Sequence, residues 1–353
     1  MNIGSKIKHL RSKAGLTQDQ LASRLGISGQ SVSKWETSVT MPDICLLPSL
    51  AGELGVSIDE LFDLTVEQKM HRIEKKIDCE GEISPMLFSE YEEFLKNQLD
   101  DKKHHEKSTE LLAQLYHHRM ESDSRRVSKY AREAIIFAPE NKACQWLLNK
   151  AEGQTVWDWN FCNHAHIIDF YKDVIKNDKG IPKTPLPYYF VIDNLISDHR
   201  TQEARHYLAE FAKLPAHKPC MIPIYKAHIA LAEYRESEAD AIIETAAKEF
   251  FADDAFVFEA AQYYAKKAEY EKAILYYKQS WEISPRPKFT DPMHGIALIY
   301  EIMGDREKAA EAYDSIISTL KDEWGYTDDD ITVIEANSEK ARLLERGGAT
   351  SKE

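Results

Sequence analysis

The sequence predicts an all-α protein. Glycine and proline, which interrupt helices most strongly, number 14 and 13 among 353 residues, each about 4% and below the usual ~7% and ~5%. Apolar residues recur at helical spacing through most of the chain. Similar segments return about every 35 residues in the C-terminal half, which is typical of stacked helix pairs.

Charge is unevenly distributed along the chain. The formal net charge is −14, but residues 1–42 contain six Lys or Arg and two acidic residues and carry +4, so the remainder carries −18. We therefore expect only the N-terminal part to meet a polyanion such as DNA.

Several classes of protein are disfavoured by composition. Apolar runs fall far short of the ~18 residues that a membrane-spanning helix needs, and the first residues, MNIGSKIKHLRSKAG, contain no apolar targeting stretch. We therefore expect a cytoplasmic protein without a membrane partner. The five cysteines are odd in number and widely spaced, which argues against a disulfide framework or a zinc ribbon.

The first helices are predicted by apolar spacing and caps. Ile3, Ile7 and Leu10 recur at the spacing of one amphipathic helix. Thr17 and Gln20 form a capping box that begins a second helix.

A tight turn and a third helix follow. Gly26 can adopt the left-handed conformation that ends the second helix, and Ser28 can cap the third. Val32 and Trp35 face inward from this third helix. Two further short helices are predicted by apolar residues that include Ile44, Leu47, Leu50, Ala51, Leu54, Ile58, Leu61 and Phe62.

The motif GLTQDQLASRLGISGQSVSKWE, followed by MPDICLLPSLAGELGVSIDELF, resembles the Cro/C1-type helix-turn-helix domain of the Xre family of repressors. The resemblance covers about residues 3–64. It implies a lambda-repressor-like domain of five helices over residues 1–65. One departure is that Thr37 and Ser38 occupy a turn where the family usually has glycine.

The resemblance implies that the helix after Ser28 lies in the major groove of DNA. Gln30 can pair with adenine, whereas Lys34 can reach guanine or a phosphate. Gly29 leaves one base-reading position without a side chain, and Lys6, Lys8 and Arg11 add attraction to phosphates. The candidate DNA-contacting residues are Thr17, Gln18, Ser28, Gln30, Ser31, Ser33, Lys34 and Ser38. The small charge excess predicts that tight binding needs a homodimer that reads two half-sites about 34 Å apart on double-stranded operator DNA.

Residues 66–104 read as a helical linker. Val66, Met70, Ile73 and Ile77 recur at helical spacing, and another amphipathic helix follows Ser84. These helices are either a dimerisation or hinge element or the first packed helices of the next domain.

The segment 105–350 is predicted to be a helical-repeat domain. Ala204, Ala239, Ala273 and Ala309 occupy similar positions, spaced 35, 34 and 36 residues apart. This period resembles the tetratricopeptide repeat, an α-solenoid of helix pairs, over about residues 185–320. Upstream, TELLAQLYHHRM and RRVSKYAREAIIFAPE read as a degenerate helix pair, and residues 327–344 read as a capping helix.

Such arrays bind peptides or proteins on the concave face formed by the first helix of each pair. The repeat register predicts that this face carries Tyr189, Asp193, Ile224, His228, Phe258, Gln262, His294 and Leu298. The other possibility is that several of these side chains belong to the core between helices.

No nucleotide-binding, hydrolase, zinc-protease or EF-hand motif is present, so we expect neither an enzyme nor a cofactor. Cys162 and His166 are spaced four apart, but no further ligand completes a metal site nearby. Trp157 and Trp159 are more typical of a core than of a ligand site.

Taken together, the sequence predicts a transcriptional regulator whose repeat domain dimerises and senses a signalling peptide or protein. The alternative is an interaction scaffold in which the helix-turn-helix serves as an autoregulatory or docking module.

Overall fold

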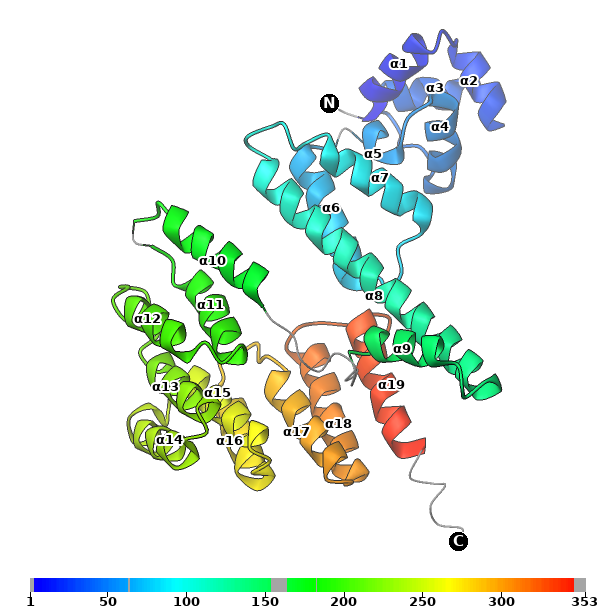
Figure 1. Cartoon of the computed structure of the whole chain (residues 1–353). Helices are drawn as coiled ribbons and strands as arrows, with labels where there is room; N and C mark the ends of the chain where they lie inside the picture. The colour runs from blue at the N-terminus through cyan, green and yellow to red at the C-terminus, as the bar shows by residue number, and fades with distance from the viewer. Residues whose placement is uncertain (1–2, 63, 154–163, 182, 346–353) are drawn as a thin grey trace. The chain divides into compact units, whose positions relative to one another are not determined.

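A computed structural model describes residues 3–62, 64–153, 164–181 and 183–345 (Figure 1). All the regular structure in these residues is helical, which confirms the all-α prediction. Contacts divide the chain into two compact units, residues 1–144 and 145–353, which are described separately.

The first unit begins with five α-helices and one short 3₁₀ helix. They are α1 (Ile3–Lys13), α2 (Gln18–Leu25), α3 (Gly29–Glu36), η1 (Ile44–Leu46), α4 (Leu47–Leu54) and α5 (Ile58–Leu61). The predicted caps are present: Thr17 and Gln20 form a reciprocal capping box, and Gly26 ends α2 at φ 70°. Their core includes Ile7, Leu21, Val32, Trp35 and Leu50, all buried.

Helix α1 packs closely against α3. A Cβ atom added at Gly4 would lie 2.1 Å from the carbonyl oxygen of Trp35, so only glycine allows this approach. Between the same helices, the guanidinium of Arg11 donates to the carboxylate of Glu36 through Nε at 2.5 Å and Nη2 at 3.0 Å. The Glu36 side chain is only 2% exposed, so this ion pair lies in the interior of the domain.

Three further helices pack together after the five-helix domain. They are α6 (Val66–Cys79), α7 (Pro85–Lys96) and α8 (His105–Phe137). Their shared core contains Met70, Ile73, Phe88, Leu111 and Leu115. The segment predicted as a linker, residues 66–104, therefore packs against the first half of α8.

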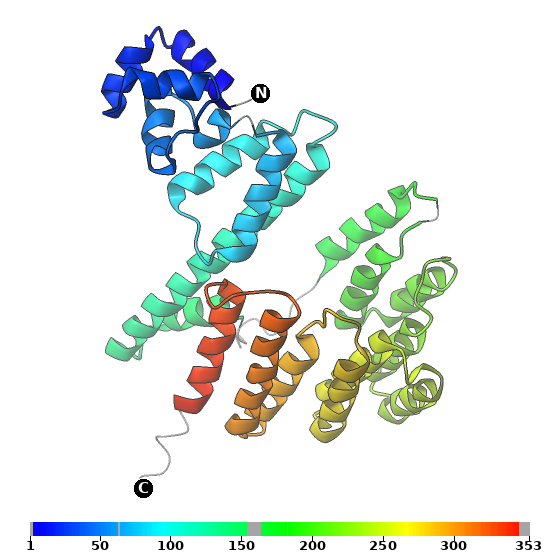
Figure 2. The same ribbon diagram turned by 180° about the vertical axis from the view of Figure 1, so that it is seen from behind.

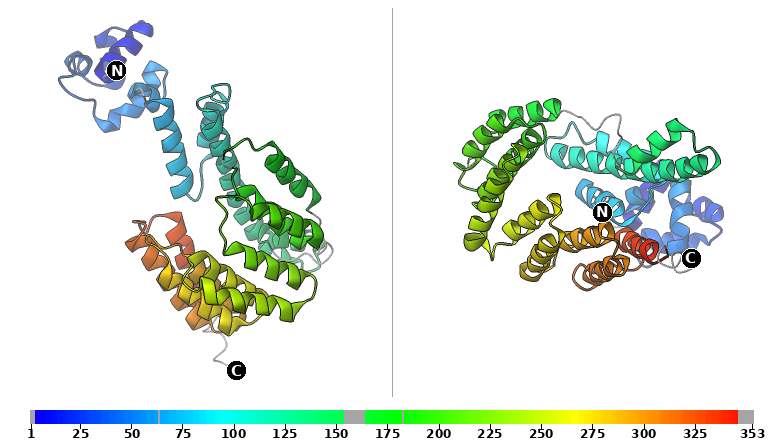
Figure 3. Two further views of the ribbon diagram at one scale, coloured as in Figure 1. Left: turned by 90° about the vertical axis from the view of Figure 1, so that its left-hand side faces the viewer. Right: turned by 60° about the horizontal axis from the view of Figure 1, so that its bottom comes forward.

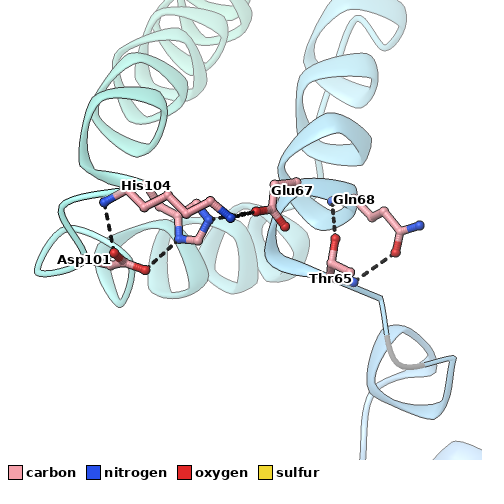
Figure 4. Close-up of polar contacts among 6 residues, drawn as sticks. Thr65, Glu67, Gln68, Asp101 and His104 are labelled. Atoms are coloured by element: carbon pink, nitrogen blue, oxygen red, sulfur yellow. Dashed lines mark hydrogen bonds and ion pairs between the residues drawn. The ribbon is translucent and has the colours of Figure 1, made fainter. Parts of the chain in front are cut away.

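Polar contacts fix the start of α6 against the start of α8 (Figure 4). Thr65 and Gln68 form a capping box, with the Thr65 amide donating to Gln68 Oε1 at 2.9 Å. Beside it, the Glu67 carboxylate pairs with Lys103 and lies 3.1 Å from Nε2 of His104. The other ring nitrogen of His104, Nδ1, lies 2.8 Å from Asp101.

Helix α8 corrects the predicted helix pair before Pro139. It is a single helix of 33 residues, because its sequence contains neither glycine nor proline to interrupt the backbone hydrogen bonds. Two contacts also hold its middle: His118 Nε2 lies 2.5 Å from the carbonyl oxygen of Glu80, and Arg125 donates to the carbonyl of Gly81 at 2.6 Å.

Antiparallel helix pairs build the second unit (Figure 2). Helix α9 (Lys142–Ala151) crosses the boundary between the two units. It is followed by α10 (Ala165–Asn177), α11 (Leu186–Ser197), α12 (Thr201–Phe211), α13 (Met221–Ala232), α14 (Glu236–Phe250), α15 (Asp254–Lys266), α16 (Tyr270–Ile283), α17 (Asp291–Ile302), α18 (Arg306–Asp322) and α19 (Ile331–Glu345). The pairs α11–α12 to α17–α18 follow one another along an arc (Figure 3), as predicted for a solenoid.

The predicted repeat register is confirmed by burial and by backbone conformation. The four alanines that define it are all fully buried, at Ala204, Ala239, Ala273 and Ala309. The turn inside each pair contains one residue with positive φ, and these residues keep the same spacing along the chain. They are His199 (55°), Tyr234 (60°), Ala268 (59°) and Gly304 (84°).

No helix in the described part of the chain combines the length and the apolar composition that crossing a lipid bilayer requires.

Candidate DNA interface and ligand groove

Helix α3 presents Gln30 and Lys34 from one exposed face, because residues four apart lie on the same side of a helix. Val32 and Trp35 on its opposite side are buried in the domain core. A helix held in this way offers one amide and one ammonium group to a partner outside the domain.

Two of the predicted contact residues also build the helix starts. Thr17 Oγ1 accepts a hydrogen bond from the amide of Gln20 at 3.1 Å, and Ser28 Oγ accepts one from the amide of Ser31 at 3.2 Å. The hydroxyls of Ser28 and Ser31 lie 2.9 Å apart. Ser33 is half-buried on α3.

The side chains of Gln18 and Arg11 are held within the domain. Gln18 Nε2 donates to Glu36 at 2.8 Å, next to the Arg11 pair. Arg11 is therefore not the free phosphate-attracting cation that the sequence suggested. Burial by itself would raise the pKa of Glu36, but the bonds from Arg11 and Gln18 outweigh it and lower that pKa below its usual value.

The turn after α3 has the backbone conformation for which glycine is usual. Ser38 adopts φ 61°, so a serine occupies a left-handed position at this turn. Its side chain is exposed.

At the start of α3, Gly29 lies against Asp19 of α2. A Cβ atom at Gly29 would lie 2.0 Å from Asp19 Oδ1, the tip of an exposed side chain that can turn aside.

In the second unit, α11, α13 and α15 line two adjoining hollows of about 410 and 490 Å³. Five of the eight predicted groove residues line them: Tyr189, Asp193, Ile224, His228 and Gln262. Asp193 and His228 contribute to both hollows, so the two are parts of one groove.

The other three predicted groove residues lie outside these hollows. Phe258 is half-buried and its ring meets Tyr277 edge-on at 5.7 Å between centroids. His294 packs against Tyr313 at 5.9 Å, and burial lowers its pKa. Leu298 is 58% exposed on α17.

The groove is also lined by residues that the repeat register did not predict, among them Tyr225, Glu259, Lys218 and Lys266. Tyr225 and Glu259 each directly follow a predicted residue, Ile224 and Phe258, in that register. The register assigned only one residue per helical turn to the groove. Assigning the neighbouring position as well would have included Tyr225 and Glu259.

Carboxylates of Glu236, Asp240 and Glu269 converge within 4.8 Å of one another, as metal ligands would. The ammonium of Lys267 already lies among them, at 3.1, 2.6 and 2.7 Å. Cys162 of the Cys162–His166 pair, and likewise Trp157 and Trp159, lie outside the described residues.

Two families match the chain. Residues 7–61 match the helix-turn-helix family, and residues 256–287 match the tetratricopeptide repeat. Both agree with the resemblances found in the sequence and with the helices described above.

Curated relatives match only the N-terminal domain. The HTH-type transcriptional activator BcrR of Enterococcus faecalis is 38% identical over 62 residues, covering 18% of this chain and 30% of that protein. An uncharacterized HTH-type transcriptional regulator of Sinorhizobium fredii, y4dJ, is 40% identical over 65 residues, covering 18% of this chain and 84% of that protein. The chain thus spans less than a third of the length of BcrR.

Among solved structures, that of Bacillus thuringiensis PlcR in complex with the peptide PapR7 and DNA aligns with 97% of this chain and 99% of that chain. The sequence identity is 14% and the TM-score is 0.26.

Proposed function

We propose that this chain, which belongs through its N-terminal domain to the helix-turn-helix family of transcriptional regulators, binds operator DNA in a sequence-specific way and regulates transcription in the cytoplasm. Its repeat domain is proposed to mediate dimerisation and to sense a peptide or protein ligand. No catalytic step is part of this proposal.

The observation that carries the DNA-binding part is the exposed pair Gln30 and Lys34 on α3. The opposite side of α3 is locked into the core by Val32 and Trp35, so the pair is presented on a rigid element. An amide and an ammonium are side chains suited to reading base edges in the major groove. The surrounding positive charge of residues 1–42 favours approach to phosphates.

The observation that carries the ligand-sensing part is the groove across α11, α13 and α15. It combines aromatic, amide and charged side chains in a hollow of the size that holds several residues of an extended chain. A ligand that prefers one curvature of the array would shift the population of that curvature and thereby the operator affinity.

The test is selection of bound duplexes from a randomised pool by the wild-type protein and by the variant Gln30→Ala/Lys34→Ala. We expect the wild type to enrich one motif. The variant should lose preference at particular base pairs, at about 1–3 kcal/mol for each lost base contact.

Lys13→Ala is the matched control, because it also removes one positive charge but lies exposed in the last turn of α1 and not on α3. It should weaken binding to all sequences alike and leave the motif intact. If the wild type enriches no motif, with or without cell extract, the scaffold alternative is favoured instead.

A further inference from the structure

The groove has a centre to which three successive repeats contribute. Asp193 of α11, His228 of α13 and Glu259 of α15 each line both of its adjoining hollows. The side wall beside them is aromatic, with the rings of Tyr189 and Tyr225 at 6.3 Å between centroids. We call these five residues the acidic centre.

The two carboxylates of the acidic centre have no ion-pair partner within 4.0 Å among the described residues. Asp193 accepts a hydrogen bond from the Tyr225 hydroxyl, which leaves lone pairs of its carboxylate open to the groove. Asp193 is exposed to the groove, but the surrounding helices still desolvate its carboxylate and raise its pKa to about 6. Burial followed by repulsion from Asp193 raises the pKa of Glu259. Both carboxylates are therefore short of compensating positive charge.

The cations of the groove do not supply that charge at close range. Lys266 and Lys218 are exposed, one in each hollow, and they attract the Glu259 carboxylate without forming an ion pair with it. His228 at the centre is uncharged near neutral pH, because burial, followed by the charge of Lys266, lowers its pKa to about 4. Its ring instead packs against Tyr263 at 5.8 Å.

We propose that the acidic centre binds a positively charged group of a peptide, either an amino terminus or a Lys or Arg side chain. This inference rests on the proposed function, in which the groove holds a peptide. The carboxylates of Asp193 and Glu259 would accept hydrogen bonds from the cation, and the half-buried ring of Tyr189 would offer its electron-rich face to it, while the buried Tyr225 holds Asp193 through its hydroxyl.

The positions of Lys218 and Lys266 also suit a peptide whose cation binds the acidic centre. A peptide seated at the centre through a cation would extend past one lysine or the other, where its own carboxylates would be attracted. The arrangement thus suits a mixed-charge peptide whose basic group is central.

The experiment uses a heptapeptide library, prepared once with free and once with acetylated amino termini, in which one position at a time is fixed as Lys, Arg, Gln, Glu or norleucine. Peptides retained by the immobilised full chain are identified by mass spectrometry. We expect the wild type to enrich Lys or Arg at one position or a free amino terminus. Asp193→Asn/Glu259→Gln should lose that enrichment by roughly tenfold or more while still retaining peptides.

The matched control is Glu249→Gln/Glu282→Gln. It removes two exposed carboxylates of the same domain, on α14 and α16, neither of which lines the groove. This control should keep the wild-type preference. Retained peptides remade with an acetylated amino terminus, or with norleucine in place of lysine, then distinguish the two sources of the cation.

The charge-reversed variant Asp193→Lys gives a second measurement, in which the enriched charge should change from Lys or Arg to Glu. Retention of peptides by the wild type without preference for a cation would overturn the acidic centre and leave peptide sensing in place. Retention of no peptide at all would instead remove the peptide-sensing part of the proposed function, and this inference with it.

Discussion

At the residue scale, the Arg11–Glu36 pair shows how one interaction organises the DNA-binding domain. It joins α1 to α3, and Gln18 at the start of α2 adds a third bond to the same carboxylate. Because the Glu36 side chain is 2% exposed, its removal would leave the Arg11 guanidinium, itself 12% exposed, without a counter-charge.

We therefore expect Glu36→Gln to destabilise this domain by about 3 kcal/mol at neutral pH. Hydrogen–deuterium exchange of peptides from α1 and α3 in the full chain measures the free energy of opening. The control is Glu53→Gln, whose carboxylate pairs with Arg24 at 3.1 Å but is 35% exposed, and it should change the opening free energy by less than about 0.5 kcal/mol.

The pH dependence of the same pair has a definite sign. The pKa of Glu36 is lower in the folded domain than the value of ~4.3 for an unfolded chain. Its stabilisation is therefore complete above that value and is lost as the pH falls through the folded-state pKa. The difference in opening free energy between wild type and Glu36→Gln should shrink at acid pH. A constant difference between pH 7 and pH 3 would contradict the ion-pair explanation.

At the element scale, the repeat pairs share a turn that requires a left-handed residue. Only the last of the four turns has glycine there, at Gly304, whereas His199, Tyr234 and Ala268 adopt positive φ with a Cβ atom. The left-handed conformation costs roughly 1–2 kcal/mol for such residues, so packing of the helices outweighs this local preference.

Ala268→Gly should therefore raise the free energy of unfolding of the repeat domain by about 0.5 kcal/mol. Glycine removes the cost of the left-handed conformation, but its greater freedom in the unfolded chain offsets part of that gain. Urea unfolding followed by circular dichroism measures the change. The control is Ala241→Gly, the same substitution at an exposed position inside α14, which should destabilise by about 1 kcal/mol. Equal effects of the two substitutions would contradict the role assigned to positive φ.

At the scale of the whole molecule, the proposed function needs two DNA-binding domains in one particle. We expect a single domain with a charge of +4 on residues 1–42 to bind DNA weakly and a dimer to add the affinity of a second half-site.

An operator with one half-site destroyed should bind at least roughly tenfold more weakly than the intact operator. Insertion of five base pairs between half-sites should weaken binding more than insertion of ten, because five place the second half-site on the opposite face of DNA. Gel-shift titration with both operators, beside sedimentation of the free protein, gives the measurement. Equal affinity for one and two half-sites would show that a monomer suffices.

The sequence by itself determined the repeat register and most of the helices with their caps, but it divided the single helix α8 into two. The alanines at 204, 239, 273 and 309 reveal the repeat because the same packing position returns in each helix pair. Thr17 with Gln20, and Gly26, act over one to four residues, where helical geometry is fixed by local bonding. For the same reason the spacing of Gln30 and Lys34 alone was enough to assign both to one helix face.

Only the tertiary structure decided which faces meet. The sequence did not bring Asp193, Tyr225 and Glu259 together, because their proximity depends on how α11, α13 and α15 stack along the arc. It also did not show that Arg11 and Gln18 both bond to Glu36. Contacts between residues far apart in sequence follow from the packing of whole helices, which local spacing does not encode.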